Sequence, residues 1–210
     1  PFFLAMNRNK QGITLDLKRP EAKEIVKKLI RESDVVVSNY RAGVLDKLGL
    51  GYEDGKKLNP RIIYCEAMGY GSSGPYVKLP GQDLLAQAMS GYCNICGTEG
   101  QPATGGIYMV DMYSSLMLVV GILAALNHVK DGGSGQKVEV NLLSSALHMQ
   151  SQELCYYMNT GIMPKKSRDY TGHPLQEAPY GIYKTKNGFL AMAINAGQDM
   201  KRFSEIIGLP

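Results

Sequence analysis

The sequence is poor in metal-binding residues and has no long run of charge. Its 210 residues include three histidines and four cysteines, and its Lys and Arg residues are interleaved with Asp and Glu to a net charge of +4. A nucleic-acid partner is therefore not expected, because such a surface needs clustered cations. The histidines are isolated and far from the pair Cys93 and Cys96, so a zinc site lacks its remaining ligands. We predict no metal site.

The chain also opens without an initiator methionine, a charged leader or a cleavage site. Nothing therefore indicates secretion, and we interpret the chain as part of a longer protein. Cys93 and Cys96 lack the cationic neighbours of a redox pair, so we expect reduced thiols in a cytoplasmic protein. A content of 44% hydrophobic and 20% charged residues is that of a globular protein able to bury a core.

The first third of the chain alternates between short β-branched runs and helical patterns. Pro20 and Glu21 mark a helix start, and the run from Val35 to Val37 is typical of a strand buried on both faces of a parallel sheet. The predicted strands are 13–17, 34–38 and 61–67, and the predicted helices are 20–32, 44–48 and 52–58. This order predicts an α/β fold with a doubly wound, parallel, Rossmann-like sheet.

A glycine-rich stretch, Gly69 to Gly74, follows the third predicted strand and matches the dinucleotide-binding fingerprint letter for letter. That motif must open a long helix, whereas Pro75, Pro80 and Gly81 break the chain within a few residues. An acidic residue at a strand end about 20 residues further on is also missing. A nicotinamide-dependent oxidoreductase is therefore an alternative and not the leading prediction.

A long apolar helix, predicted over 112–129, has a single carboxylate, Asp111, at its head. Residues 116–126 are almost all apolar, so we expect this helix inside the molecule, and we judge it too short and too closely flanked by charge to span a membrane. Asp111 either caps the first turn or, with Gly105 and Gly106 giving access to a carboxylate that the helix N-terminus keeps ionised, acts as a nucleophile. The residue types alone favour the cap.

The second half of the chain changes character near residue 164. Before it, we predict a helix over 82–90 with Asp83 in its first turn, a strand over 137–141 and a helix over 142–158. After it, we predict a hairpin of strands 180–184 and 189–194 and a helix over 198–207. The expected domains are a large one over 1–163 and, over 164–210, a linker and the start of a small α+β domain. His148 lies four residues after Ser144 without a nucleophile elbow, so we expect a structural histidine.

Short motifs spread along nearly the whole chain carry a family resemblance. They are NRNK at 7–10, LDLK at 15–18, DVVVSNYR at 34–41, LGLG at 48–51, LNPR at 58–61, PGQD at 80–83, the Asp111 helix and GQKVEV at 135–140. Together they resemble the class III coenzyme A transferase family, which includes formyl-CoA, carnitine-CoA and bile-acid CoA transferases and the related 2-methylacyl-CoA racemases. The resemblance implies a longer protein that forms an interlocked homodimer.

The resemblance also assigns roles to residues. It places the catalytic aspartate on Asp111 and a second acidic residue on Asp83. In such enzymes the carboxylate attacks an acyl-CoA to form a mixed anhydride, and the returning CoA thiolate gives an aspartyl-CoA thioester that a free carboxylic acid opens. The implied coenzyme A contacts are Leu15, Asp16, Leu17, Lys18, Asn39, Tyr40, Arg41, Lys47, Pro80, Gly81, Gln82 and Asp83. Acyl-CoA and a carboxylic acid are substrates, and neither a tightly bound cofactor nor a membrane partner is implied.

Physical arguments agree with part of this assignment. Residues 15–18 and 39–41 lie at the carboxyl ends of predicted parallel strands, where open α/β sheets bind nucleotides. Lys18, Arg41 and Lys47 suit phosphates. Read one at a time, these cations are solvated surface charge. Racemases of the family carry a histidine base where this chain has Gln82, so the sequence favours CoA transfer over racemisation. A non-catalytic CoA-binding protein is the remaining alternative.

Overall fold

The computed structural model describes residues 2–168, 171–194 and 197–208, and it divides into two compact units. The first unit joins residues 1–66 to 120–138, and the second joins 67–119 to 139–210. Strands β2 (Ile63–Met68) and β5 (Lys137–Asn141) and helix α7 (Met109–Lys130) each pass from one unit into the other. The domain boundary near residue 164 stays a prediction.

The first unit is built on a three-stranded sheet with the strand order β1-β2-β5. Strand β1 (Val35–Ser38) runs parallel to β2, with Val35 opposite Ile63 and Ser38 opposite Glu66. Strand β2 is buried along most of its length. Val37 of β1, however, is 60% exposed. Val35 and Val36 are only half-buried. The prediction that this run is buried on both faces was therefore wrong, and Val37 borders a cavity at the end of the strand.

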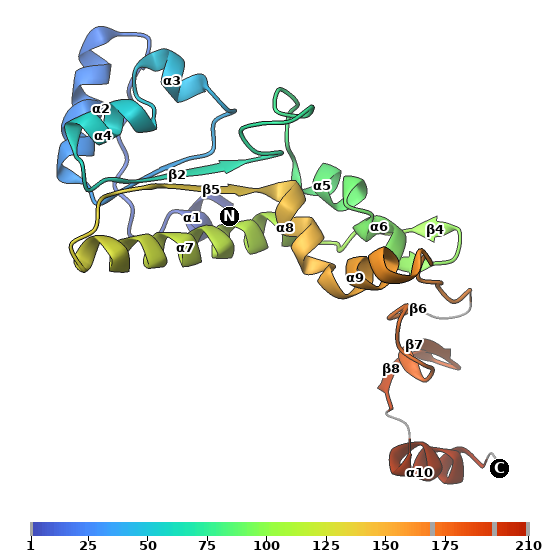
Figure 1. Ribbon diagram of the computed structural model, residues 1–210. Helices are drawn as coiled ribbons and strands as arrows, with labels where there is room; N and C mark the ends of the chain where they lie inside the picture. Colours follow the sequence, from blue (N-terminus) through green and yellow to red (C-terminus); the bar gives the residue numbers. More distant parts are fainter. Residues whose placement is uncertain (1, 169–170, 195–196, 209–210) are drawn as a thin grey trace. The chain divides into compact units, whose positions relative to one another are not determined.

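Helices cover both faces of this sheet within the first unit (Figure 1). Helices α2 (Pro20–Glu32), α3 (Val44–Leu48) and α4 (Tyr52–Leu58) lie on one face, and the second half of α7 lies on the other. Ile30, Leu50 and Ile62 form the core between helices α2, α3 and α4 and the sheet. Because the sheet is parallel and helices cover both its faces, the predicted α/β class is confirmed. A short helix, α1 (Phe2–Met6), precedes these elements.

Helix α7 is longer and more exposed than the sequence predicts. Leu116 and Leu123 are 58% and 60% exposed, although Ala125 is buried, so the expectation of a fully interior helix was wrong for the described chain. By length and composition alone the helix could cross a membrane, so judging it too short was also wrong. Its contact with β5 is nevertheless that of a helix covering a sheet, because a Cβ added to Gly121 would lie 2.6 Å from Cγ1 of Val138.

Two other predicted elements differ from the structure. Residues 13–17 are irregular, because a strand needs a hydrogen-bonded neighbour and none of the described sheets includes this segment. The predicted helix over 142–158 breaks at Gln150 into α8 (Leu142–Met149) and α9 (Ser151–Thr160). The buried Gln150 side chain donates to Oγ of Ser90 and to the carbonyl of Ala146, both at 2.9 Å.

The second unit packs two helices against the start of α7. Helix α5 (Asp83–Met89), the first turn of α7 and helix α8 meet through Ala86, Val110 and Ala146. Further along lie helix α6 (Tyr92–Ile95) and the short strands β3 (Gly97–Thr98) and β4 (Gln101–Pro102). The C-terminal part holds an antiparallel sheet of β6 (Thr171–Gly172), β7 (Tyr180–Thr185) and β8 (Gly188–Ala193), then helix α10 (Gln198–Ile207). The predicted hairpin and last helix are confirmed.

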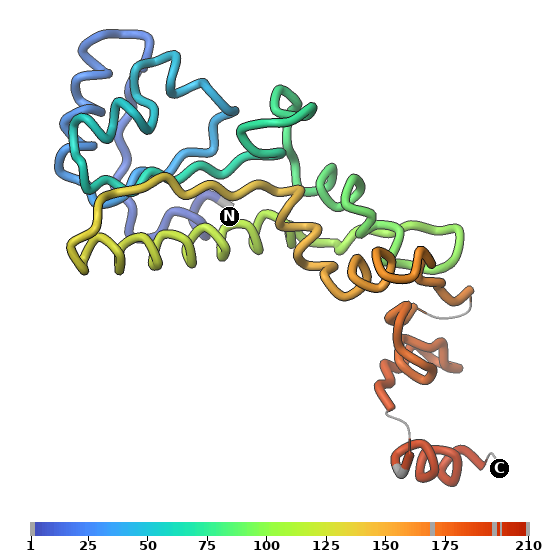
Figure 2. The backbone as a smooth tube through the Cα atoms, in the orientation of Figure 1, coloured from blue at the N-terminus to red at the C-terminus, as the bar shows by residue number. Residues whose placement is uncertain are grey.

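Between β2 and α5 the chain forms a loop that closes on itself (Figure 2). The two ends touch through glycine backbone, since a Cβ added to Gly81 would lie 2.2 Å from Cα of Gly69. Inside the loop the amide of Leu79 donates to the carbonyl of Tyr76 at 2.9 Å. The glycine-rich motif therefore closes a loop and does not open a long helix, as its sequence context predicts.

Candidate active site

The site at the head of α7 is organised by Asp83, whose side chain is only 5% exposed. Its Oδ1 atom accepts hydrogen bonds from the backbone amides of Val110 at 2.8 Å and Asp111 at 3.0 Å. These amides belong to the first turn of α7, where a helix has no internal acceptors for its N–H groups. Asp83 is therefore the side chain that caps α7.

A second buried residue, Gln87, completes this arrangement. It lies one turn after Asp83 on α5, and its Nε2 donates to Oδ2 of Asp83 at 2.5 Å. Its Oε1 accepts from the backbone amide of Gly105 at 3.0 Å, in the segment that leads into α7. Gln87 was not among the predicted site residues, although its spacing of four residues from Asp83 on a predicted helix was a usable signal.

Asp111 is left free by this capping. Its side chain is exposed, and in the part of the chain that the structure describes its carboxylate has no hydrogen bond or ion pair. The expectation that Asp111 caps its own helix was therefore wrong. Partial burial, followed by the negative charge of Asp83, raises the pKa of Asp111 above its usual range. A carboxylate with a raised pKa is more basic, which suits a nucleophile.

Two glycines shape the approach to Asp111 for different reasons. A Cβ added to Gly105 would lie 2.2 Å from the sulfur of Met109, so the Met109 side chain occupies the space that a larger residue would need. Gly106 has a φ of +74°, in the left-handed region that residues with a side chain rarely adopt. The segment therefore turns sharply into α7 without a side chain of its own at either position.

His148 is engaged elsewhere in the second unit. Its Nδ1 lies 2.5 Å from the hydroxyl of Tyr113, and the two rings stack. The amide of Ser144 donates to Asn141 at the start of α8. His148 thus pairs with a tyrosine and not with Ser144, in agreement with the structural role predicted for it.

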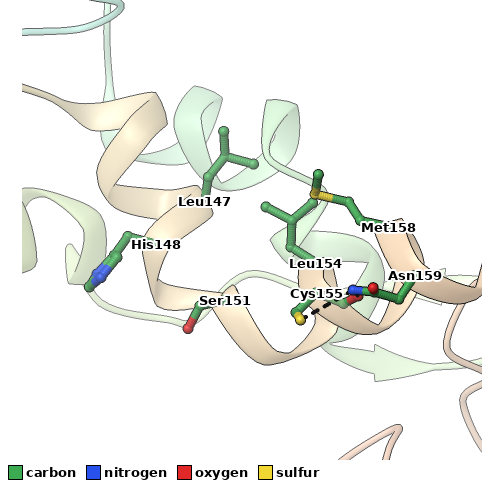
Figure 3. Close-up of a pocket in the computed structure, with 7 residues that line it drawn as sticks. All are labelled: Leu147, His148, Ser151, Leu154, Cys155, Met158 and Asn159. Atoms are coloured by element: carbon green, nitrogen blue, oxygen red, sulfur yellow. Dashed lines mark hydrogen bonds between the residues drawn. The ribbon is translucent and has the colours of Figure 1, made fainter.

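A shallow groove of about 370 Å³ lies along α8 and α9 (Figure 3). Its lining is Leu147, His148, Ser151, Leu154, Cys155, Met158 and Asn159. The lining is mostly apolar and contains no lysine or arginine among the described residues. It is therefore poorly suited to the phosphates of a nucleotide.

A second cavity, of about 350 Å³, lies within the first unit at the carboxyl end of β1. It is lined by Leu17, Val26, Ile30, Val36, Val37, Ser38, Asn39, Tyr40, Leu45, Leu50 and Tyr64. Three of the predicted coenzyme A contacts, Leu17, Asn39 and Tyr40, are therefore brought together here. The position agrees with the rule that nucleotides bind beyond the carboxyl ends of parallel strands.

The other predicted contacts in the first unit surround this segment in sequence. Lys18, Arg41 and Lys47 are exposed, and none forms an ion pair within the described residues. Asp16 stabilises a turn, because its Oδ1 accepts from the amide of Lys18 at 3.0 Å. Because residues 13–17 are irregular, only Asn39 to Arg41 follow a strand, and the placement of Leu15 to Lys18 at a strand end was wrong.

The contacts predicted at Pro80 to Asp83 lie in the second unit, beside the Asp111 helix. Pro80 and Gly81 end the closed loop, and Gln82 stands exposed at the N-terminus of α5. Asp83 is buried beneath the first turn of α7. The structure thus brings Asp83 and Asp111 together, with one carboxylate bonded and the other free.

These observations describe an α/β protein with a cavity at the carboxyl end of β1 and, in the second unit, an exposed carboxylate at the head of a capped helix. The model of CoA-transferase family III matches residues 1–210, and the chain belongs to that family.

Known proteins resemble the chain in sequence, and solved structures resemble it in fold. The chain is 35% identical over 209 residues to the succinate–glutarate CoA-transferase of Agrobacterium fabrum, covering 99% of this chain and 52% of that protein. It is 37% identical over 210 residues to the succinyl-CoA:glutarate CoA-transferase of Mus musculus, covering 100% and 48%. The crystal structure of a CAIB/BAIF family protein from Brucella suis superposes with a TM-score of 0.83 at 32% identity, covering 97% and 53%. The chain therefore spans about half the length of the curated relatives it matches.

Proposed function

We propose that the protein containing this chain transfers coenzyme A from an acyl-CoA to a free carboxylic acid, with Asp111 as the nucleophile. The observation that carries the proposal is that two neighbouring carboxylates have different surroundings. Asp83 takes the helix amides, and Asp111 is left exposed, unpaired in the described chain and with a raised pKa. Relatives named as CoA-transferases that act on succinyl-CoA or glutarate support dicarboxylic acids as the substrate class.

The reaction follows from the nucleophile. A carboxylate oxygen of Asp111 attacks the thioester carbonyl, the carbon–sulfur bond breaks, and a mixed anhydride and the CoA thiolate result. The thiolate then attacks the Asp111 carbonyl carbon and releases the first carboxylic acid, which leaves an aspartyl-CoA thioester. The second acid attacks that thioester, its carbon–sulfur bond breaks, and a new mixed anhydride and the CoA thiolate result. The thiolate then attacks the acyl carbon of this anhydride and displaces the Asp111 carboxylate. The products are the new acyl-CoA and free Asp111.

The choice of a carboxylate fits this chemistry. A serine ester would hold the acyl group too stably, whereas an anhydride keeps it activated for return to the thiolate. An anhydride is destroyed by water, so the site must exclude water while the anhydride exists.

We also propose that CoA binds at the cavity beyond β1. The apolar lining from Leu17, Val26 and Val36 suits a planar adenine ring, and Asn39 offers an amide for its edge. Lys18, Arg41 and Lys47 are exposed cations suited to the phosphates.

Lys18→Ala and Arg41→Ala should each raise the KM for acyl-CoA by roughly two- to five-fold with little loss of kcat, because an exposed charge contact is worth only about 0.2–1 kcal/mol. Steady-state kinetics of the full-length protein at two salt concentrations would measure this, with the KM rising with salt in the wild type. Lys28→Ala, on the exposed side of α2 and outside the cavity lining, is the matched control. Equal KM values in all four proteins would contradict the cavity assignment.

A homodimer is the assembly that we propose. The exposed apolar side chains of α7, among them Met112, Leu116 and Leu123, form a face that water would solvate poorly in a monomer. The family resemblance supports the same assembly with interlocked chains. A monomeric mass of the full-length protein in light scattering would contradict it.

Racemisation at the carbon next to the thioester is the second candidate, and one experiment tests both. It incubates full-length protein in heavy water with succinyl-CoA or a 2-methyl-branched acyl-CoA, with and without glutarate. We expect glutaryl-CoA to form and no deuterium to enter the α-carbon. Racemisation needs a paired acid and base, and Asp111 can supply only one of the two. Of the other candidates, Gln82 is an amide, Asp83 is bonded on both oxygens and His148 is paired with Tyr113. Rapid α-deuteration without CoA transfer would favour the racemase.

A further inference from the structure

We propose that Gln87 is a positioning residue for the reaction of Asp111, a role that rests on the proposed CoA transfer. The Gln87 side chain joins Asp83, on its own helix, to the segment that leads into α7. It donates to Asp83, accepts from the amide of Gly105, and makes a longer contact of 3.5 Å with the carbonyl of Ile107. Gln87 itself does not reach Asp111 and acts through Asp83 and the Gly105 segment.

The burial of Gln87 makes its orientation a fixed one. The side chain is only 2% exposed, so both ends of its amide need partners within the protein. An ionised Asp83 can only accept, and the amide of Gly105 can only donate. One orientation of the Gln87 amide therefore satisfies both, with nitrogen toward Asp83 and oxygen toward Gly105.

Through Asp83, this orientation of the Gln87 amide helps to fix the position of the Asp111 backbone. Oδ1 of Asp83 holds the amides of Val110 and Asp111, and Oδ2 is held by Gln87, so the Asp83 carboxylate has donors on both oxygens. The same Gln87 fixes the segment that enters α7 at Gly105. Removing it loosens the helix head and its approach together. A displacement of about 1 Å at a reacting group can cost about 100-fold in rate.

Gln87→Ala should therefore lower kcat by about 10- to 100-fold and leave the KM for acyl-CoA within about twofold. Gln150→Ala is the matched control, because Gln150 is also a buried glutamine with two hydrogen bonds in the second unit. Its side chain bonds neither Asp83 nor Gly105, and its partner Ser90 reaches only the backbone carbonyl of Gln87. Gln150→Ala should lower the melting temperature and leave kcat within about twofold.

A swap of the two side-chain types separates positioning from chemistry. Asp83→Asn turns an amide nitrogen toward the nitrogen of Gln87, donor against donor. Gln87→Glu sets a carboxylate against that of Asp83, acceptor against acceptor. The double variant Asp83→Asn/Gln87→Glu restores a donor and an acceptor at this contact, and the introduced carboxylate still accepts from Gly105. Each single change should lower kcat by about 10- to 100-fold, and the double variant should recover to within about fivefold of wild type.

The pH profile gives a readout that a merely structural role would not move. Activity needs ionised Asp111, so kcat/KM falls as the pH drops through the pKa of Asp111. The negative charge of Asp83 is one cause of the raised pKa of Asp111. Asp83→Asn should therefore shift the acid limb to lower pH, Gln87→Glu should shift it to higher pH, and Gln150→Ala should leave it in place.

Hydrogen exchange of residues 104–112 in the full-length protein tests the same network without turnover. Gln87→Ala should speed the exchange of the Gly105, Val110 and Asp111 amides by up to about tenfold, and the double variant should restore protection. The inference is overturned if Gln87→Ala changes neither kcat nor exchange, or if the double variant is no better than the worse single variant. Should the wild type fail to transfer CoA, the proposed function falls, and the exchange data still decide whether Gln87 holds the helix head.

Discussion

Asp111→Asn should lower the kcat for CoA transfer by about 10⁴-fold or more while the affinity for CoA stays within about twofold of wild type. The substitution keeps the size and shape of the side chain but removes the charge and the nucleophilic oxygen pair. Asp111 is exposed and unpaired in the described chain, so the change breaks no hydrogen bond there and leaves the cap from Asp83 in place. Steady-state transfer kinetics and calorimetric titration with CoA would measure the two quantities.

The same helix offers a matched control for this prediction. Asp131 follows the C-terminal end of α7 and is exposed, and its Oδ2 accepts from the side-chain amide of Asn127. Asp131→Asn therefore makes the same chemical change at a position 20 residues after the proposed nucleophile. It should leave kcat within about twofold. Both variants should keep the wild-type mass in light scattering. Near-normal turnover of purified Asp111→Asn would overturn the proposed mechanism.

Helices and strands whose ends are marked by a local residue pattern were predictable from the sequence. Pro20 marks the start of α2, and the glycines at 43 and 49, both at positive φ, delimit α3 where predicted. Strand β5 likewise matches its predicted residues. In each case the residues that set the bounds lie within or next to the element, so no distant contact is needed to place them.

The identity of the cap on α7 could not be predicted in the same way. Both Asp83 and Asp111 lie in the first turn of a helix, and each suits a cap of its own helix. The structure caps α7 with Asp83, which is 28 residues before Asp111 in the chain. Only the packing of α5 against α7 and α8, through Ala86, Val110 and Ala146, brings that carboxylate to the amides.

The other wrong predictions have the same cause, because each depended on a contact with a residue distant in sequence. An apolar run reports hydrophobicity and not what covers it, which is why α7 was expected inside although Leu116 and Leu123 are exposed in the described chain. Alternating residues at 13–17 suit a strand, but a strand forms only beside another. Gln150 breaks a helix that local propensity favours, because its side chain bonds Ser90 on another element.

With an acyl-CoA as the only substrate, hydroxylamine should inactivate the full-length protein completely and leave an aspartyl hydroxamate at Asp111. Without an acceptor acid the enzyme accumulates the aspartyl-CoA thioester. The nitrogen of hydroxylamine attacks the Asp111 carbonyl carbon and displaces the CoA thiolate, and the resulting hydroxamate no longer reacts with acyl-CoA. Peptide mass spectrometry would locate the modification, and the residual activity would follow its extent.

The carbonyl carbon that hydroxylamine attacks decides whether Asp111 is marked. Attack on the acyl carbon of the mixed anhydride releases an acyl hydroxamate and regenerates free Asp111, so a marked Asp111 reports attack on its own carbonyl. Added glutarate should protect, because it consumes the same thioester. Asp83 should stay unmarked, since it is only 5% exposed and both of its oxygens accept hydrogen bonds. Inactivation without acyl-CoA, or a mark on Asp83 in place of Asp111, would show that the nucleophile has been assigned to the wrong residue.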